Sequence, residues 1–215
     1  MRKLNEKIAQ LRWGSLGIRR ERGLIHLHDT LSCTGFGDKY WAIMGLLLGC
    51  MRDGVPIAWD RDADFGFLER DLPEFLAAVG ELRRQGFSPC RLQINNDGRI
   101  TKWALRYQAV KFEFFMFEER DDRLRWHYHS RKAGLEIVNE IAAHGLDEFE
   151  LYGRRWLKPD DTDAYLTALY GDWRTPDPDY VYWRDCGVSI GRHPWIGRRR
   201  RSWAITDSGQ LQHGS

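Results

Sequence analysis

The sequence has few cysteines, and they follow no pairing pattern. Its 215 residues include four cysteines that lie far apart, with no CxxC pair among them. This spacing excludes a cysteine-based zinc site and a dense disulfide framework. Free thiols, as in a cytosolic protein, are therefore the expected state. The four residues are Cys33, Cys50, Cys90 and Cys186.

Long hydrophobic runs are also missing. The longest apolar stretch lies near residues 43–50 and is too short to span a membrane. The first residues do not lead into an apolar segment of signal-peptide length, and the chain has no internal repeat or low-complexity segment. We therefore expect a cytoplasmic protein, with a peripheral position at the inner membrane surface as the alternative.

An excess of charge of one sign is the third missing feature. Lys and Arg together number 33 and Asp and Glu number 31, so the net charge is only +2. Overall charge thus gives no indication of a nucleic-acid partner. Aromatic residues, in contrast, make up 13% of the chain and include ten tryptophans, which argues against disorder. The length suits a single domain, placed at residues 1–215, with a sizeable core.

The acidic stretch WDRDADFG is the most informative part of the chain. Asp60, Asp62 and Asp64 alternate with other residues, and alternate residues share one face of a β-strand. Neighbouring carboxylates on that face, roughly 6.6 Å apart, can bind one ion, and without a cation they repel each other. A solvated edge strand or acidic turn is the simpler interpretation. The aromatic flanks, Trp59 before the three aspartates and Phe65 and Phe67 after them, favour a metal site.

A further carboxylate, Glu113, lies inside the aromatic run at residues 109–117. A charged residue in such a setting is rarely left unpaired. One interpretation is a structural ion pair with an Arg or Lys. The other is a third metal carboxylate that strand pairing brings beside Asp62 and Asp64. The residues alone leave both interpretations open.

Apolar periodicity predicts a mixture of helices and strands. A short helix over residues 4–12 is expected to end at Gly14 and Gly17. The sequence NNDG at 95–98 is a strong hairpin signal between strands at 91–94 and 100–107. The other expected elements are a buried strand at 40–45, the acidic strand, a helix from Asp71 to residue 84, strands at 109–117 and within 123–158, and a helix that follows Asp160-Asp161 and stops at Gly171.

Two His-x-His pairs are further candidates for metal binding. His26 and His28 form the first pair, and His127 and His129 form the second. On a strand, the two side chains of such a pair share one face and can hold a metal ion. The sequence places no companion ligand beside either pair, and exposed or core histidines are the simpler interpretation.

The C-terminal region is rich in tryptophan and arginine, with four arginines in a row at residues 198–201. Together with Trp183, Trp195 and Trp203, this stretch has the composition of a segment that grips RNA or an anionic surface. A mobile basic tail is the simpler interpretation. A non-catalytic binding module therefore stays an alternative function, although nucleic acid is the less expected partner.

Two stretches of the chain resemble signatures of the LicD/fukutin family. The first is YWAIMGLLLGCMR at residues 40–52, followed by PIAWDRDAD at 56–64, and the second is YLTALYGDWRTP at 165–176. Between them, Glu113 lies where the family has an acid within an apolar strand. The resemblance covers a core of about residues 24–180 and leaves 181–215 as a basic, Trp-rich C-terminal extension.

The resemblance implies an α+β, nucleotidyltransferase-like fold in which a mixed sheet is flanked by helices. It also implies Mg²⁺-dependent transfer of a phospho-alcohol group, such as phosphocholine or a polyol phosphate. The implied donor is CDP-linked, and the implied acceptor is a glycan or lipid-linked glycan at the cell surface. By analogy, Asp62, Asp64 and Glu113 bind Mg²⁺, and Asp60 orients the acceptor or takes its proton.

The resemblance also implies donor contacts in the segment after the first signature glycine. The expected donor-binding residues are Gly45, Leu46, Leu47, Gly49 and Arg52. Backbone N–H groups of the first three can bind a phosphate. Arg52 is expected to contribute a bidentate phosphate contact through its guanidinium.

Three positions depart from the family pattern. Leu46 stands where the family usually has a hydroxyl residue, Asp53 where a basic residue or His often follows the arginine, and Glu113 where Asp is more usual. These departures bear on the identity of the donor more than on the class of reaction. Nucleotidyl transfer to a small molecule or a protein by the same fold is the alternative enzymatic interpretation.

Overall fold

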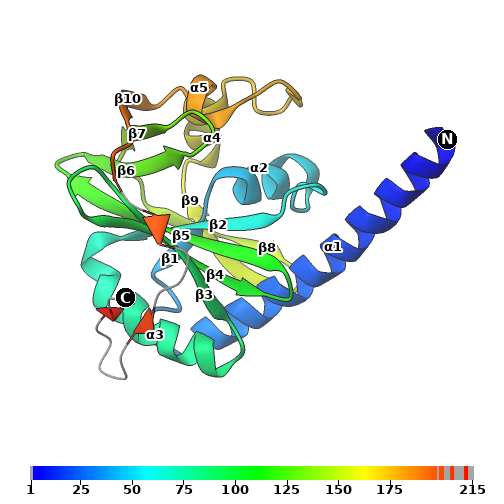
Figure 1. Ribbon diagram of the computed structural model, residues 1–215, viewed down its shortest axis with the longest axis horizontal. Coiled ribbons are helices and arrows are strands. Elements are labelled where there is room, and N and C mark those ends of the chain that lie inside the picture. Colours follow the sequence, from blue (N-terminus) through cyan, green and yellow to red (C-terminus); the bar gives the residue numbers. More distant parts are fainter. Residues whose placement is uncertain (1, 198, 201–203, 206–210, 213–215) are drawn as a thin grey trace.

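The computed structural model of the chain contains one large mixed sheet with helices at its flanks (Figure 1). The structure describes residues 2–197, 199–200, 204–205 and 211–212, with side chains described over residues 14–197. Both helices and strands contribute to this part of the chain, and the sheet contains parallel and antiparallel pairs. The predicted α+β class, with a mixed sheet flanked by helices, is confirmed.

Nine of the described strands form the main sheet. Its strands are β1 (Tyr40–Ala42), β2 (Asp62–Leu68), β3 (Ser88–Ile94), β4 (Ile100–Tyr107), β5 (Val110–Arg120), β6 (Arg123–Ser130), β7 (Leu135–Ala142), β10 (Ser189–Pro194) and β11 (Arg199–Arg200). The order is β10-β7-β6-β5-β4-β3-β11, and β2 pairs with both β1 and β5. The β2–β5 pair is parallel, so two segments far apart in sequence lie side by side.

Two small hairpins accompany the main sheet. The first pairs β8 (Leu146–Leu151) with β9 (Arg154–Pro159), and the second pairs β12 (Ala204–Ile205) with β13 (Leu211–Gln212). The helices are α1 (Arg2–Leu31), α2 (Met44–Asp53), the short 3-10 helix η1 (Glu69–Asp71), α3 (Leu72–Arg84), α4 (Thr162–Tyr170) and α5 (Tyr182–Asp185). No helix in the described residues is long and apolar enough to cross a membrane.

Helix α1 differs most from the sequence prediction. It is one helix of 30 residues, so the prediction of a short helix ended by Gly14 and Gly17 is wrong. A helical glycine costs only about 1 kcal/mol, which burial elsewhere in the helix can offset. Leu24, Leu27 and Leu31 are fully buried at helical spacing and anchor the C-terminal part of the helix to the core. The N-terminal part extends beyond the sheet (Figure 1).

The sequence predicts several other elements correctly. The hairpin of β3 and β4 turns at the NNDG sequence, and α3 ends at Arg84. Helix α4 begins after Asp161, whose side chain accepts a hydrogen bond from the Ala164 N–H at 3.0 Å. Several boundaries differ from the predictions, and two of them lie beside the acidic stretch. The strand expected at 40–45 ends at Ala42, and β2 begins at Asp62, so Asp60 lies before the strand.

The alternation of side chains on β2 separates the core from the acidic face. Ala63 and Phe65 are fully buried, and the Phe65 ring stacks on Phe114 of β5 at 5.4 Å between centroids. On the same two strands, Asp64 and Glu113 have the opposite parity and therefore face away from this aromatic core. The aromatic core thus fixes which way the carboxylates point.

Candidate functional site

The parallel pairing of β2 with β5 brings the predicted site residues together. In this register Asp64 lies beside Glu113, and Asp62 lies beside Lys111. Asp60 lies two residues before the strand, at the same end. All five side chains line one cavity of about 930 Å³. The carboxylates singled out in the sequence therefore share one cavity.

The cavity walls differ in chemical character. One wall is a face of α2 that runs from Met44 to Arg52, and another is the basic and polar surface of β3, β4 and β5. A third wall comes from β6 and from the segment that follows α4, and it is rich in aromatic rings. Within it, the rings of Tyr128 and Tyr182 lie 4.5 Å apart, and those of Tyr170 and Tyr180 lie 5.0 Å apart. Aromatic rings of this kind stack on flat or apolar ligand faces.

Glu113 is surrounded by basic side chains. Lys102 Nζ contacts Glu113 Oε2, Lys111 Nζ lies 2.8 Å from Oε1, and Arg91 lies 3.6 Å from Oε1. Burial raises the pKa of Glu113, but the two lysines outweigh burial and lower this pKa to about 2. Glu113 is therefore ionised and takes part in an ion-pair cluster. Its role as a metal ligand stays a prediction.

Asp60 and Asp64 lack this degree of compensation. Burial, followed by the charges of Asp62 and Glu113, raises the pKa of Asp64 well above its usual value. Burial and a hydrogen bond with Asp62 raise the pKa of Asp60 to about 7. Carboxylates that raise each other's pKa values repel one another when all are ionised. A bound proton or cation would relieve this repulsion.

The aspartates provide a chemical basis for a cation site. Carboxylate oxygens are the ligands that Mg²⁺ prefers, and Asp62 and Asp64 face the cavity on one strand. In the part of the chain that the structure describes, no three Asp, Glu, His or Cys side chains are already gathered to hold a metal ion. Two of the carboxylates are in contact with lysines: Lys102 contacts Glu113, and Lys111 contacts one oxygen of Asp62. Asp62 and Asp64 thus fit a cation, which remains a prediction.

Two glycines of α2 allow the acidic segment to approach the helix. A Cβ at Gly45 would lie 2.5 Å from Asp60 Oδ2, and a Cβ at Gly49 would lie 2.5 Å from the Ile57 N. Leu46 and Leu47 are buried, and the Leu47 N–H donates to the Ile43 carbonyl at 3.2 Å. The first N–H groups of a helix have no partner within the helix, and the N-cap residue of α2, Ile43, provides no side-chain hydrogen bond to them. The backbone at Gly45 and Leu46 is therefore the part of α2 that suits an anion.

Replacing Gly45 by Ala tests this close approach. We expect at least a tenfold loss of activity, because the added methyl group displaces the Asp60 carboxylate. Activity and thermal unfolding measured together separate this local effect from misfolding. The control is Gly80→Ala in α3, where a Cβ meets nothing within 4 Å and should stabilise the helix by about 1 kcal/mol. Full activity in the Gly45 variant would contradict the expectation.

Arg52 lines the cavity, but its guanidinium is already engaged. Its Nε and Nη2 atoms donate to the two carboxylate oxygens of Asp53, at 3.0 and 2.8 Å. This bidentate pair uses the geometry that a phosphate would need. The predicted phosphate contact therefore requires Arg52 to exchange Asp53 for the donor, and it stays a prediction.

Sequence reasoning missed Arg20, which holds the acidic segment in place. Arg20 of α1 is 2% exposed and donates to three backbone carbonyls. The acceptors are Ile57 at 2.7 Å, Asp60 at 2.8 Å and Pro56 at 3.0 Å. One buried guanidinium thus fixes the path of the chain up to Asp60. Its only sequence signal is membership of the arginine cluster at 19–22, which does not identify a partner.

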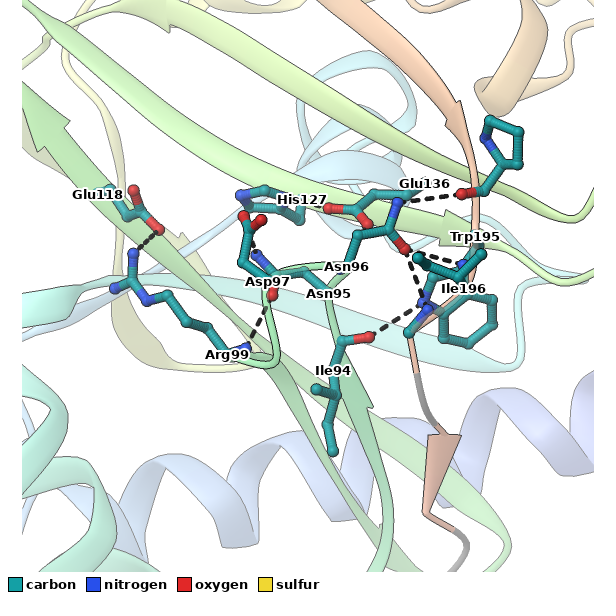
Figure 2. A network of polar contacts seen from close by, with 12 residues as sticks. Ile94, Asn95, Asn96, Asp97, Arg99, Glu118, His127, Glu136, Trp195 and Ile196 are labelled. Carbon is teal, nitrogen blue, oxygen red and sulfur yellow. Dashed lines mark hydrogen bonds and ion pairs between the residues drawn. The ribbon is translucent and has the colours of Figure 1, made fainter.

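The two histidine pairs occupy different structures. His26 and His28 lie on α1, where residues two apart do not share a face, and each ring nitrogen Nε2 bonds a backbone carbonyl at 2.9 Å. His127 and His129 lie on β6 as predicted. His127 bonds Glu136 at 2.7 Å (Figure 2), whereas His129 lines the cavity. Burial, followed by the charges of His127 and Lys102, lowers the pKa of His129 to about 3 and keeps it neutral.

The segment after β10 is bound to the β3–β4 turn (Figure 2). The Asn96 side chain accepts hydrogen bonds from the N–H groups of Ile196 and Gly197 and donates to the Pro194 carbonyl. Trp195 donates to the Ile94 carbonyl at 3.0 Å. Trp195 is therefore part of the fold. The side chains at 198–201 and Trp203, which carry the predicted binding module, lie outside the described residues.

Comparison with known protein families gives one match over residues 37–161. The matching family is described as LicD/FKTN/FKRP, nucleotidyltransferase domain. The matched range covers more than half of the chain and includes α2, the three aspartates and Glu113. No curated protein matches the chain.

Proposed function

Because the chain belongs to the LicD/FKTN/FKRP nucleotidyltransferase-domain family, we propose that it transfers a phospho-alcohol group from a CDP-linked donor to a glycan acceptor. The family membership indicates a transferase of the phosphotransferase type. Phosphocholine and polyol phosphates are the proposed groups, and Mg²⁺ is the proposed cofactor. The observation that carries the proposal is the parallel register of β2 and β5, which gathers Asp62, Asp64 and Glu113 in one cavity.

In the proposed reaction, an acceptor hydroxyl oxygen attacks the phosphorus that carries the alcohol group. A new P–O bond forms, the P–O bond of the diphosphate bridge breaks, and CMP leaves. Asp62 and Asp64 would hold Mg²⁺, which neutralises charge on the phosphoryl oxygens when it is bound. The N-terminal backbone of α2 would bind the phosphates from the other side.

Asp60 suits the role of general base. Its carboxylate lines the cavity beside Asp62, and burial together with the Asp62 hydrogen bond raises its pKa, which makes it a better proton acceptor than an exposed carboxylate. The proton of the acceptor hydroxyl would pass to the Asp60 carboxylate as the new P–O bond forms. Arg20 holds the Asp60 backbone, and the missing side chain at Gly45 lets the Asp60 carboxylate lie against the N-terminal end of α2. The aromatic wall opposite would pack against the face of an acceptor sugar.

Nucleotidyl transfer uses the same carboxylates and is the alternative reaction. The description of the family as a nucleotidyltransferase domain keeps this alternative in view. The two reactions differ in which phosphorus is attacked, and the mass of the product separates them. A product that gains the phospho-alcohol supports the proposal, and one that gains a nucleoside monophosphate supports the alternative.

Donor binding can be tested without knowing the acceptor. A ligand that binds only the folded state raises the free energy of unfolding by about 2.7 kcal/mol at a hundredfold excess over Kd. For a chain of this size we therefore expect CDP-choline or CDP-ribitol with Mg²⁺ to raise Tm by about 5–10 °C. With EDTA in place of Mg²⁺ the shift should be much smaller.

Heparin is the control for the binding-module alternative. A basic surface responds to any polyanion and does not need Mg²⁺. If heparin raises Tm while CDP, CTP and the CDP-alcohols leave it unchanged with Mg²⁺ present, the proposed function is wrong. The binding module then becomes the better explanation.

A further inference from the structure

Lys111 occupies a bridging position between two of the predicted metal carboxylates. Its ammonium contacts Asp62 Oδ2 and lies 2.8 Å from Glu113 Oε1. Its side chain is 18% exposed, and it lines the same cavity. Lys111 is the cross-strand neighbour of Asp62 in the parallel register, so β2 and β5 position this contact. An ammonium thus lies where a cation shared by Asp62 and Glu113 would lie.

Glu113 and Asp62 differ in how they depend on Lys111. Glu113 has a second partner, because Lys102 contacts its Oε2, and Lys102 is 6% exposed. For Asp62, Lys111 is the ion-pair partner among the described side chains, and Asp62 also shares a hydrogen bond with Asp60. Loss of Lys111 therefore leaves Glu113 with Lys102 and leaves Asp62 without an ion-pair partner. Asp64 lies beside Glu113 on the same face. Its pKa is raised, and it forms no ion pair in the described part of the structure.

The charge of Lys111 is maintained in this environment. Burial lowers the pKa of Lys111, but Glu113 and Asp62 outweigh burial and raise it. A charged ammonium on one oxygen of Asp62 and a divalent cation on the other repel each other strongly at such short distances. Binding of a divalent cation at Asp62 and Asp64 therefore favours a move of Lys111 away from Asp62.

We propose that Lys111 is an exchangeable counter-ion that bridges Asp62 and Glu113 in the free protein and binds a donor phosphate when a divalent cation replaces it. The inference rests on the proposed function, since it assumes a cation and a diphosphate donor. A lysine side chain is long and flexible, and its ammonium binds phosphate as a compact point charge. Lys111 thus neutralises carboxylate charge when no metal is bound, and after the exchange it supplies a positive charge beside the cation.

The proposal predicts opposite effects on two binding equilibria. Removing the ammonium removes a competitor for Asp62, so affinity for a divalent cation should rise. It also removes a phosphate contact, so affinity for the donor should fall. A lysine that merely supports the cation site would give the opposite sign for the first equilibrium. The sign of the change in metal affinity therefore separates the two roles.

The experiment compares wild type, Lys111→Met and Lys132→Met by calorimetric titration with Mg²⁺ alone. Lys132 lines the same cavity and takes no part in the ion pairs of this cluster, so its variant controls for a general loss of positive charge. We expect Lys111→Met to bind Mg²⁺ at least tenfold more tightly than wild type. Lys132→Met should change this affinity less than threefold.

Two further measurements complete the test. In EDTA, Lys111→Met should unfold at a lower temperature than wild type, because Asp62 loses its counter-ion, and added Mg²⁺ should restore this loss. With Mg²⁺ present, the variant should bind CDP-choline at least tenfold more weakly. If the Met variant does not fold, Lys111→Gln keeps a hydrogen-bond donor without the charge and replaces it in all three measurements.

Equal or weaker Mg²⁺ binding by the Lys111 variant overturns the exchange. If wild type still shows the Mg²⁺-dependent Tm shift with CDP-choline in that case, the proposed function survives. If wild type binds neither Mg²⁺ nor a CDP-alcohol, the proposed function fails, and the exchange fails with it. The two failures are thus separated by the behaviour of the wild-type protein.

Discussion

Replacing Asp64 by Asn is expected to abolish turnover while leaving the fold intact and more stable in the absence of a cation. Asn has nearly the same shape as Asp but carries no charge, so it cannot neutralise a bound divalent cation. In the proposed reaction this removes stabilisation of the charge that develops on the phosphoryl oxygens. We expect at least a thousandfold loss of turnover, which corresponds to about 4 kcal/mol in the activation barrier.

The stability effect follows from the direction of the pKa shift. Burial, followed by Asp62 and Glu113, raises the pKa of Asp64 in the folded protein, so the folded state binds this proton more tightly than the unfolded state. The free energy of unfolding therefore falls as pH rises from the unfolded-state pKa, about 4, through the raised folded-state pKa. Asn does not titrate and avoids this loss. The stability difference between variant and wild type should grow from pH 4 to pH 8.

The measurements are product formation with a CDP-alcohol and thermal unfolding in EDTA across that pH range. Asp177→Asn is the matched control, because Asp177 lines the same cavity but lies in the exposed segment after α4. Turnover near the wild-type level in the Asp64 variant would remove Asp64 from the cation site. A variant that is less stable than wild type at pH 8 would contradict the raised pKa.

Asp60→Asn separates the roles left open for Asp60. If Asp60 only orients the acceptor, the loss of activity should be milder than for Asp64, because an amide can still form hydrogen bonds. If Asp60 is the base, as proposed, turnover should fall severely and lose its dependence on pH near 7. Comparison of the two pH profiles distinguishes these roles.

The sequence predicts the acidic face because that information is local. Alternation along β2 places Asp62 and Asp64 on one side and Phe65 on the other, and a strand has only these two faces. The same alternation places Glu113 opposite Phe114 on β5. The apolar pattern also suggests that both strands are buried. These local rules set the face on which each carboxylate lies, whereas the pairing of β2 with β5, which brings the three together, is not local.

The rest of the site depends on contacts between distant segments. Lys102 reaches Glu113 because β4 pairs with β5, and nothing in the sequence around Lys102 marks it as a partner. Gly14 and Gly17 suggest the end of a helix, yet α1 continues because its later turns are buried. Without that continuation, the position of Arg20 beside the acidic segment could not be predicted. Tertiary packing overrides local propensity at this point.

Replacing Arg20 by Met is expected to destabilise the fold and impair catalysis through Asp60. The side chain is 2% exposed and donates to three carbonyls between Pro56 and Asp60. Hydrogen bonds from a charged group contribute more than neutral ones, and buried carbonyls left without a donor carry a desolvation penalty. After allowing for the lower desolvation of Met, we expect a loss of about 3 kcal/mol in the free energy of unfolding.

For a chain of this length, that loss corresponds to a fall in Tm of about 6–12 °C. Arg19→Met is the matched control, because Arg19 is the neighbouring arginine, is exposed, and bonds only Ser15 of its own helix among the hydrogen bonds of its described side chain. That variant should unfold within about 1 °C of wild type, since an exposed contact of this kind contributes little. Similar Tm changes in the two arginine variants would contradict the role of Arg20 as a buried clamp.

The pH dependence of catalysis is a second measurement, and it would not change if Arg20 only supported the fold. The positive charge of Arg20 lowers the pKa of Asp60, in opposition to burial and Asp62. Without Arg20, the pKa of Asp60 should rise further, so less of the carboxylate is ionised at a given pH. The acid limb of the pH–rate profile should therefore move to higher pH in Arg20→Met at a temperature where the variant is folded. Arg20→Lys should show a smaller shift, because it keeps the charge but cannot reach three carbonyls at once.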